Sequence, residues 1–171
     1  MDIAKFPKFK YHPNLYHTQI VVFGKGICNC CKKKTEAYIE SMYAEEETDC
    51  ICLDCVADGK AASMFDGQFI QDADVLDNEE ATDELFHRTP GYFSWQGENW
   101  KACCNDYCAY IAGLDEKDFL DSTIREQLKS GEIINDTDMT VEDIINGASY
   151  IRGYLFKCLH CNRLYLRVDM D

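Results

Sequence analysis

Apolar and polar residues alternate near both ends of the chain, which is typical of β-strands. Residues 6–12 alternate aromatic and basic side chains between two prolines and predict an extended arm or edge strand. Residues 35–43 form a strand-like run that an acidic turn at 45–47 follows. Residues 154–157 and 164–168 form a second pair of strand-like segments around a short turn. We therefore predict one β-hairpin early in the chain and another at its end.

The middle of the chain repeats apolar residues every three to four positions, as amphipathic helices do. A short helix is predicted over 79–86, after a cap at Asp77 or Asn78. A second helix is predicted over 98–111 from the residues that recur at helical spacing: Trp100, Cys104, Tyr107, Cys108 and Ile111. This helix would point Cys104 and Cys108 to the same face.

A third helix is predicted over 115–129, where Leu120, Ile124 and Leu128 mark its inner face. Gly131 is expected to end this helix, because glycine tolerates the left-handed backbone of a helix C-terminus. Thr140 and Asp143 resemble a capping box at the start of a further short helix.

Acidic side chains outnumber basic ones, and the excess lies in the middle of the chain. The 171 residues carry a formal net charge of −14. Residues 66–150 have 20 acidic and five basic side chains, whereas the segments before and after have net charges of −1 and +2. Nucleic acids bind mainly to cationic surfaces, so this balance disfavours a nucleic-acid partner. We interpret the basic run 32–34 as a solvated turn.

The chain carries the marks of a cytoplasmic protein. No apolar run approaches the roughly 18 residues of a membrane span, and the first residues lack the apolar core of a secretory signal. We therefore expect no membrane partner. Eleven cysteines in a reducing compartment favour metal binding over disulfide bonds.

Four cysteines form two C-x-x-C pairs with the spacing of a closed tetrahedral zinc site. They are Cys28 with Cys31 and, twenty residues later, Cys52 with Cys55. Each pair places two sulfur atoms on one side of a tight turn, and two facing turns supply the four thiolates that zinc accepts. A site with four protein ligands has no open position, so it predicts a structural role.

A third C-x-x-C pair, Cys158 with Cys161, needs two more ligands. Cys104 and Cys108 complete a second predicted zinc site, because the predicted helix would place both on one face. The chain would then bind two zinc ions. Three alternatives stay open: His160 or His87 replaces one sulfur, Cys103 is used in place of Cys104, or the later cysteines are buried without a metal.

Together these features predict an α+β fold, with residues 1–171 forming a single compact domain. Two zinc-ribbon or knuckle-like β-hairpins would be joined by a helical middle segment. The first ribbon is expected over 20–65, an acidic and mostly helical middle over 66–150, and a C-terminal hairpin with the second zinc knuckle over 151–171.

Several segments resemble the CbrC family of small bacterial proteins, which takes its name from a colicin-tolerance protein. The resemblance covers most of residues 6–112 and 154–168 and is clearest over 52–69 and 88–100. Leu53 and Cys103 stand where the family pattern has proline and histidine. The shared cysteines are Cys28, Cys30, Cys31, Cys52, Cys55, Cys104, Cys108, Cys158 and Cys161.

The resemblance implies a bacterial cytoplasmic protein linked to stress or colicin tolerance, and it implies no reaction. Our first hypothesis is a zinc-stabilised binding or regulatory module. A protein partner or small ligand would bind through residues 58–100, where Tyr92, Trp95 and Trp100 either line a groove or pack in the core. The sequence does not define an oligomeric state.

Two other functional classes remain as alternatives. One is an enzyme, either a thiol oxidoreductase that uses Cys28 and Cys31 or a hydrolase that uses Asp58, Asp66 and Asp106 with nearby histidines. The other is a nucleic-acid-binding zinc ribbon. No catalytic residue is assigned, because the closed four-cysteine frame favours a structural role.

Overall fold

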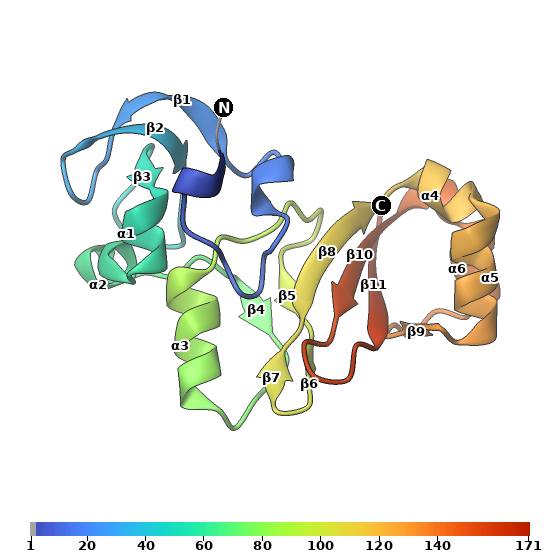
Figure 1. Ribbon diagram of the computed structural model, residues 1–171. Coiled ribbons are helices and arrows are strands. Elements are labelled where there is room, and N and C mark those ends of the chain that lie inside the picture. The colour runs from blue at the N-terminus through green and yellow to red at the C-terminus, as the bar shows by residue number, and fades with distance from the viewer. Residues whose placement is uncertain (1–2) are drawn as a thin grey trace.

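The computed structural model, which describes residues 3–171, has one β-sheet at each end of the molecule (Figure 1). The N-terminal sheet is antiparallel in the order β1-β2-β3 and is followed by helices α1 and α2. These elements are β1 (Val22–Ile27), β2 (Lys34–Ile39), β3 (Ile51–Cys52), α1 (Leu53–Ala57) and α2 (Lys60–Phe65). Short 3₁₀ turns over Ile3–Lys5 and Leu15–His17 precede them. The strand predicted over 35–43 is present as β2 but ends at Ile39.

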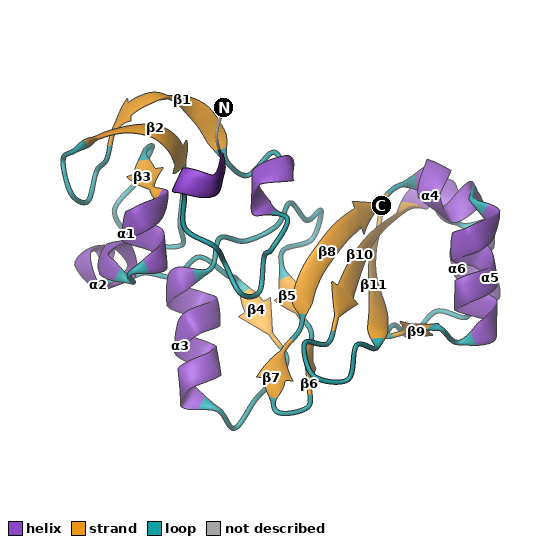
Figure 2. Ribbon diagram, in the orientation of Figure 1, coloured by secondary structure: helices purple, strands orange, loops and turns teal. Residues whose placement is uncertain are grey.

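The C-terminal sheet has the order β8-β10-β11-β9. Its strands are β8 (Ala109–Leu114), β9 (Ile133–Asn135), β10 (Ile151–Lys157) and β11 (Leu164–Met170). β10 and β11 form the predicted C-terminal hairpin, and β9 is parallel to β11. Helices lie at the outer side of this sheet (Figure 2): α4 (Glu116–Leu120), α5 (Ser122–Ser130) and α6 (Val141–Asn146), with a 3₁₀ turn over Ala148–Tyr150.

Short elements connect the two sheets. β4 (Asp72–Ala73) pairs in parallel with β5 (Asn99–Trp100), and α3 (Glu79–Arg88) lies between them in sequence. β6 (Ala102–Cys103) and β7 (Asp106–Tyr107) form a tight hairpin. The chain is thus mixed α+β, but the segment 66–150 is less helical than predicted, because it contains six strands among the described residues.

The helix predicted over 98–111 is wrong, since this segment forms β5 to β8. Cys104 and Asn105 have φ angles of 57° and 56°, which reverse the chain in a two-residue hairpin turn. A right-handed helix cannot pass through two left-handed residues. Trp100, Tyr107 and Tyr110 are buried in one aromatic core. They enter this core from short strands, so their spacing in the sequence does not indicate a helix.

The other helix predictions are confirmed in their main points. Asn78 caps α3 by accepting a hydrogen bond from the backbone N–H of Ala81. The helix predicted over 115–129 is divided at Asp121, whose side chain caps α5. Because of this break Leu120 is exposed and does not lie on the predicted inner face, whereas Ile124 and Leu128 pack in the C-terminal cluster. Gly131 ends α5 with φ 77°, and Thr140 with Asp143 forms a complete capping box for α6.

Buried side chains form three clusters: one around the N-terminal sheet, an aromatic one in the middle of the molecule, and one between the C-terminal sheet and its helices. Tyr92 stacks on Tyr110 in the middle cluster with ring centroids 4.5 Å apart. The predicted N-terminal arm is buried at Phe9, which belongs to the first cluster, and at Tyr11, which belongs to the second. The arm therefore ties the two clusters together.

Candidate metal centres

Two C-x-x-C segments, 28–33 and 158–163, fold into the same knuckle. In each, the first cysteine's backbone N–H donates to the carbonyl five residues later, and its carbonyl accepts from the N–H four residues later. The residue after the second cysteine, Lys32 or Asn162, has a φ near 60°. This turn leaves both sulfur atoms of each knuckle on one side, as a metal requires.

The first group of sulfur atoms joins the N-terminal knuckle to the start of a helix. Cys52 is the residue before α1 and Cys55 lies within it, so this pair is not the second knuckle of a zinc ribbon. The Sγ atoms of Cys28, Cys31, Cys52 and Cys55 all lie within 4.8 Å of one another, and those of Cys31 and Cys52 are 3.8 Å apart. A tetrahedron of Zn–S bonds of about 2.3 Å has edges of about 3.8 Å. The sulfur spacing therefore fits a metal ion held by four thiolates.

Backbone N–H groups stabilise a thiolate in this group. Burial raises the pKa of the Cys28 thiol, but hydrogen bonds from the N–H groups of Cys52, Cys31 and Cys30 outweigh burial and lower the pKa to about 7. Burial raises the pKa of Cys52 to about 12. A divalent cation would supply the positive charge that four adjacent thiolates need, because ligand thiols are deprotonated on binding.

The second group differs from the predicted ligand set. It contains Cys103, Cys104, Cys158 and Cys161, whose Sγ atoms also lie within 4.8 Å of one another. Cys103 Sγ lies 3.5 Å from Cys104 Sγ and 3.8 Å from Cys161 Sγ. Cys108 lies outside the group and is fully buried in the aromatic core.

Cys103 takes the ligand position predicted for Cys108 because this segment forms the β6–β7 hairpin. In a helix, residues 104 and 108 share a face, but here the two-residue turn brings Cys103 and Cys104 together at its tip. From the sequence, Cys103 is expected only as an alternative to Cys104. The available signal was the Cys-Asn pair before Asp106, because asparagine tolerates the left-handed conformation of such turns.

The second knuckle polarises its first sulfur as the first knuckle does. The N–H groups of His160 and Cys161 each lie 3.4 Å from Cys158 Sγ. Burial raises the pKa of Cys158, but these bonds outweigh burial and lower the pKa to about 6. The Tyr165 hydroxyl lies 3.2 Å from Cys103 Sγ and can donate to it.

The two groups differ in their access to solvent. In the first, Cys28, Cys52 and Cys55 are buried and Cys31 is half-buried. In the second, Cys104 and Cys161 are exposed, Cys103 is half-buried and only Cys158 is buried.

The histidines that were candidates to replace a sulfur bind carboxylates instead. His160 Nε2 lies 2.9 Å from Asp106 Oδ2, and His87 Nδ1 lies 2.9 Å from Asp83 Oδ1. Neither histidine belongs to a sulfur group. Asp106 also pairs with Lys10 at 2.8 Å, so it is a structural anchor for the N-terminal arm.

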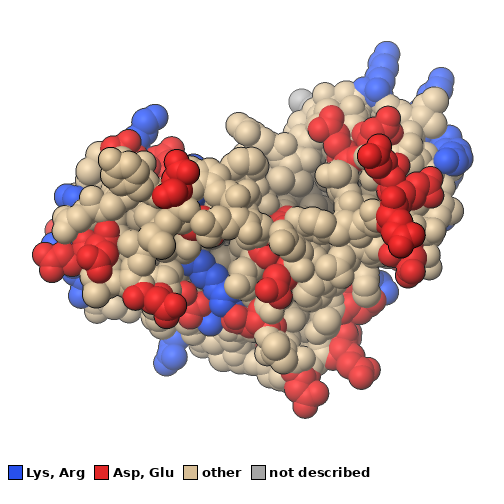
Figure 3. Space-filling model, turned by 180° about the vertical axis from the view of Figure 1, so that it is seen from behind, with Lys and Arg blue, Asp and Glu red and all other residues tan. Residues whose placement is uncertain are grey.

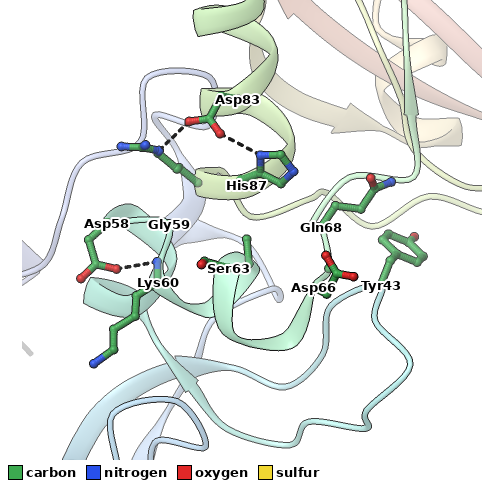
Figure 4. Close-up of a pocket in the computed structure, with 12 residues that line it drawn as sticks. Tyr43, Asp58, Gly59, Lys60, Ser63, Asp66, Gln68, Asp83 and His87 are labelled. Atoms are coloured by element: carbon green, nitrogen blue, oxygen red, sulfur yellow. Dashed lines mark hydrogen bonds and ion pairs between the residues drawn. The ribbon is translucent and has the colours of Figure 1, made fainter.

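An open pocket of about 830 Å³ lies between α2 and the end of α3 (Figure 4). Its lining comes mainly from residues 58–68 and 83–88, within the segment predicted to bind a partner. Asp83 holds His87 and also accepts from Arg88 Nε at 2.9 Å. The hydrogen bond from His87 is the main cause that lowers the pKa of the Asp83 carboxyl. His87 Nε2 has no hydrogen-bond partner among residues 3–171.

The aromatic residues proposed for a groove divide between core and surface. Tyr92 and Trp100 are buried in the aromatic cluster, so for them the core interpretation is correct. Trp95 is 46% exposed. Its backbone N–H and that of Gln96 donate to Asp169 Oδ2, which also accepts from the Tyr154 hydroxyl.

A family model described as "Uncharacterised protein family (UPF0167)" matches residues 6–170. The chain belongs to this family. A UPF0167 protein of Pseudomonas aeruginosa is 32% identical, with 95% of this chain and 96% of the relative aligned. UPF0167 proteins of Mycobacterium bovis and Mycobacterium tuberculosis are each 33% identical, with 92% of this chain and 89% of the relative aligned. No solved structure matches the chain.

The assignment to UPF0167 corrects the resemblance to the CbrC family. The family model spans almost the whole chain, including residues 113–150, where the CbrC pattern did not match. The link to colicin tolerance therefore has no support. UPF0167 relatives in bacteria fit the expectation of a bacterial protein.

The surface of this UPF0167 chain is mixed in charge. On the face in Figure 3, acidic side chains gather over both ends of the molecule, with Lys and Arg side chains between them and at the upper edge. Over residues 3–171, none of the helices has both the length and the apolar character needed to span a bilayer.

Proposed function

We propose that this UPF0167 chain is a zinc-stabilised binding protein. In this proposal two four-cysteine sites hold the fold together, and the pocket between α2 and α3 takes a small ligand. The main support is that segments far apart in sequence bring two sets of four sulfur atoms within 4.8 Å of one another. Buried or clustered thiols without a metal would repel one another once ionised, so the arrangement suits a cation.

The donor set favours zinc over other metals. Four thiolates suit zinc or an iron–sulfur centre, whereas magnesium and calcium prefer oxygen ligands. Two of the three C-x-x-C pairs form knuckles whose own backbone N–H groups donate to the first sulfur. Such hydrogen bonds support metal-bound thiolates. Closed sites of this kind stabilise folds, so we assign no catalytic residue.

Metal analysis of matched variants tests the sites. The wild-type protein is expected to contain two zinc ions per chain. Cys103→Ser should lower this content to about one, whereas Cys108→Ser should leave it at two, because Cys108 lies outside both groups. Two ions in Cys103→Ser and one in Cys108→Ser would restore the ligand set predicted from sequence. If the purified protein contained iron and absorbed visible light, the proposed metal would be iron and not zinc.

The pocket supports binding of a small molecule that carries both charges. Its lining includes the acids Asp58, Asp66 and Asp83 and the bases Lys60, His87 and Arg88. Asp83 is occupied by His87 and Arg88, but the side chains of Lys60 and Asp66 make no hydrogen bond or ion pair within residues 3–171. In Figure 4 the Lys60 side chain points away from Asp66 and His87. The Asp66 carboxylate can receive the ammonium group of a zwitterion, and the guanidinium of Arg88, whose Nε bonds Asp83, can receive its carboxylate.

A thermal-shift screen with the common L-amino acids tests the pocket. An amino acid that binds should raise the melting temperature of the wild-type protein, and Asp66→Asn should abolish the rise. Glu126→Gln on α5 is the matched control, since it removes one carboxylate outside the pocket. No shift with any amino acid would contradict this ligand class.

The thiol-redox alternative has less support. Cys52 and Cys55 stand at a helix start, where reactive C-x-x-C pairs occur, but α1 has only five residues and two further thiols face the pair. None of the eleven cysteines in residues 3–171 forms a disulfide bond. Such a state persists in a reducing compartment, so we propose that the protein works in the cytoplasm.

A further inference from the structure

The two sulfur groups present their thiols to solvent very differently. The first is enclosed by the N-terminal core cluster, to which Cys28, Cys52 and Cys55 belong. The second lies at the tip of the β6–β7 hairpin and the C-terminal knuckle, where Cys104 and Cys161 are exposed. A dissolved small molecule can therefore reach sulfur in the second group and not in most of the first.

We propose that the second group, Cys103, Cys104, Cys158 and Cys161, is a peroxide-sensitive site. A hydroperoxide oxidises two of its thiolates to a disulfide, and the site then loses its metal while the first site keeps its own. This inference rests on the proposed zinc sites. It adds that hydroperoxides react with one of the two sites and that only this site loses its metal. Sulfur oxidation requires thiolate and access. Bound zinc would hold its ligands as thiolates in both groups, and the second group adds exposure to solvent at Cys104 and Cys161.

The reaction begins at Cys161, which is an exposed residue of the knuckle. Its thiolate attacks one peroxide oxygen, the O–O bond breaks and hydroxide leaves, so that Cys161 becomes a sulfenic acid. The thiolate of Cys103 then attacks the Cys161 sulfur, the S–S bond forms and the S–O bond breaks with loss of a second hydroxide. One peroxide gains the two electrons that the two sulfurs lose.

Cys103 is the favoured partner because of its position. Its Sγ lies 3.8 Å from that of Cys161. Cys103 is the last residue of β6, whereas Cys161 lies in the knuckle between β10 and β11. Cys104 is the immediate neighbour of Cys103, so a bond between those two would strain the backbone of the turn. The Tyr165 hydroxyl at 3.2 Å can stabilise the attacking Cys103 thiolate.

The disulfide removes half of the ligand set. Cys104 and Cys158 alone remain, and two thiolates do not form the closed four-coordinate site that zinc prefers in structural positions. In the first group the corresponding close pair, Cys31 and Cys52 at 3.8 Å, has the spacing but not the access, since Cys52 is buried. Spacing alone therefore does not make both groups sensitive.

The test treats zinc-loaded wild-type protein with hydrogen peroxide and follows zinc release with a chromogenic chelator. We expect one zinc per chain to be released at least ten times faster than the other. Peptide mapping after rapid alkylation should find the Cys103–Cys161 disulfide, with Cys28, Cys52 and Cys55 still reduced. A thiol reductant and added zinc should restore the original content.

Other outcomes overturn the inference. Release of both ions at similar rates, faster oxidation of the first group, or slow release without a disulfide in the second group each contradict it while leaving the zinc sites intact. Purified protein that contains no metal and takes up none would instead refute the zinc sites and the inference with them. Tyr165→Phe adds a check, since it should slow disulfide formation and leave the zinc content at two.

Discussion

Protonation of a buried histidine should destabilise this protein in mild acid. The His12 side chain is 1% exposed and its Nδ1 lies 3.0 Å from the Pro90 carbonyl oxygen. Its ring meets those of Trp100 and Tyr110 edge to face, and Nε2 has no partner within the described residues. Burial lowers the pKa of His12 from 6.5 to about 4, although the backbone hydrogen bond to Pro90 opposes the shift.

Acid lowers the free energy of unfolding because the folded protein favours the neutral His12 ring. The pKa in the folded state lies below that in the unfolded state, so the unfolded chain binds the proton first. The contribution of neutral His12 to the free energy of unfolding is complete above pH 6.5 and declines as the pH falls toward 4. A difference of about 2.5 pKa units corresponds to about 3 kcal/mol lost by pH 4.

Denaturant unfolding of wild type and His12→Asn at pH 7 and pH 4 measures this contribution. Asparagine does not titrate and keeps a donor for the Pro90 carbonyl. We expect the wild-type protein to lose about 3 kcal/mol more than the variant between the two pH values. Proton competition at the cysteine groups affects both proteins alike and cancels in the difference. An equal loss in both proteins would refute the assignment of a neutral buried ring.

Three further predictions concern single contacts. Arg167→Gln should cost roughly 2 kcal/mol in the free energy of unfolding, because Asp74 and Asp136 both pair with Arg167 and would keep Lys101 as their one cationic partner within the described residues. Arg163→Gln, which lies outside this set of ion pairs, is the control. Asn78→Ala should cost about 1 kcal/mol in the same assay by removing the α3 cap. Asp169→Asn should loosen the loop of Trp95, seen as faster amide exchange at residues 95 and 96, whereas unchanged exchange would contradict this anchor role.

Local signals predicted the elements whose determinants lie within a few residues. The caps at Asn78 and Thr140 and the stop at Gly131 depend on side chains that bond neighbouring backbone groups, so they are readable from sequence. The prediction of a helix over 98–111 was wrong because the apolar residues in this segment do not lie on one face of a helix. Trp100, Tyr107 and Tyr110 enter one aromatic cluster from separate strands, and that cluster also needs Tyr154 and Phe156 from the end of the chain.

The candidate site shows the same division. The grouping of Cys28, Cys31, Cys52 and Cys55 could be predicted because two C-x-x-C pairs at this separation meet in one small unit. The pocket could be placed only in a broad segment, 58–100, since its lining joins α2 to the end of α3 and to Tyr43. Binding of zinc by either group stays a prediction that metal analysis decides.

The sequence by itself determined the chemistry of this protein: paired thiols, knuckle turns, helix caps and an acidic middle segment. The tertiary structure alone decided that Cys103 stands with Cys104, Cys158 and Cys161 while Cys108 is buried in the aromatic core. It also decided that one sulfur group is enclosed and the other exposed. The physical reason is one of distance along the chain. Local turns set the spacing of the two cysteines in each C-x-x-C pair. Packing between segments more than fifty residues apart decides which further cysteines join them and how exposed the group is.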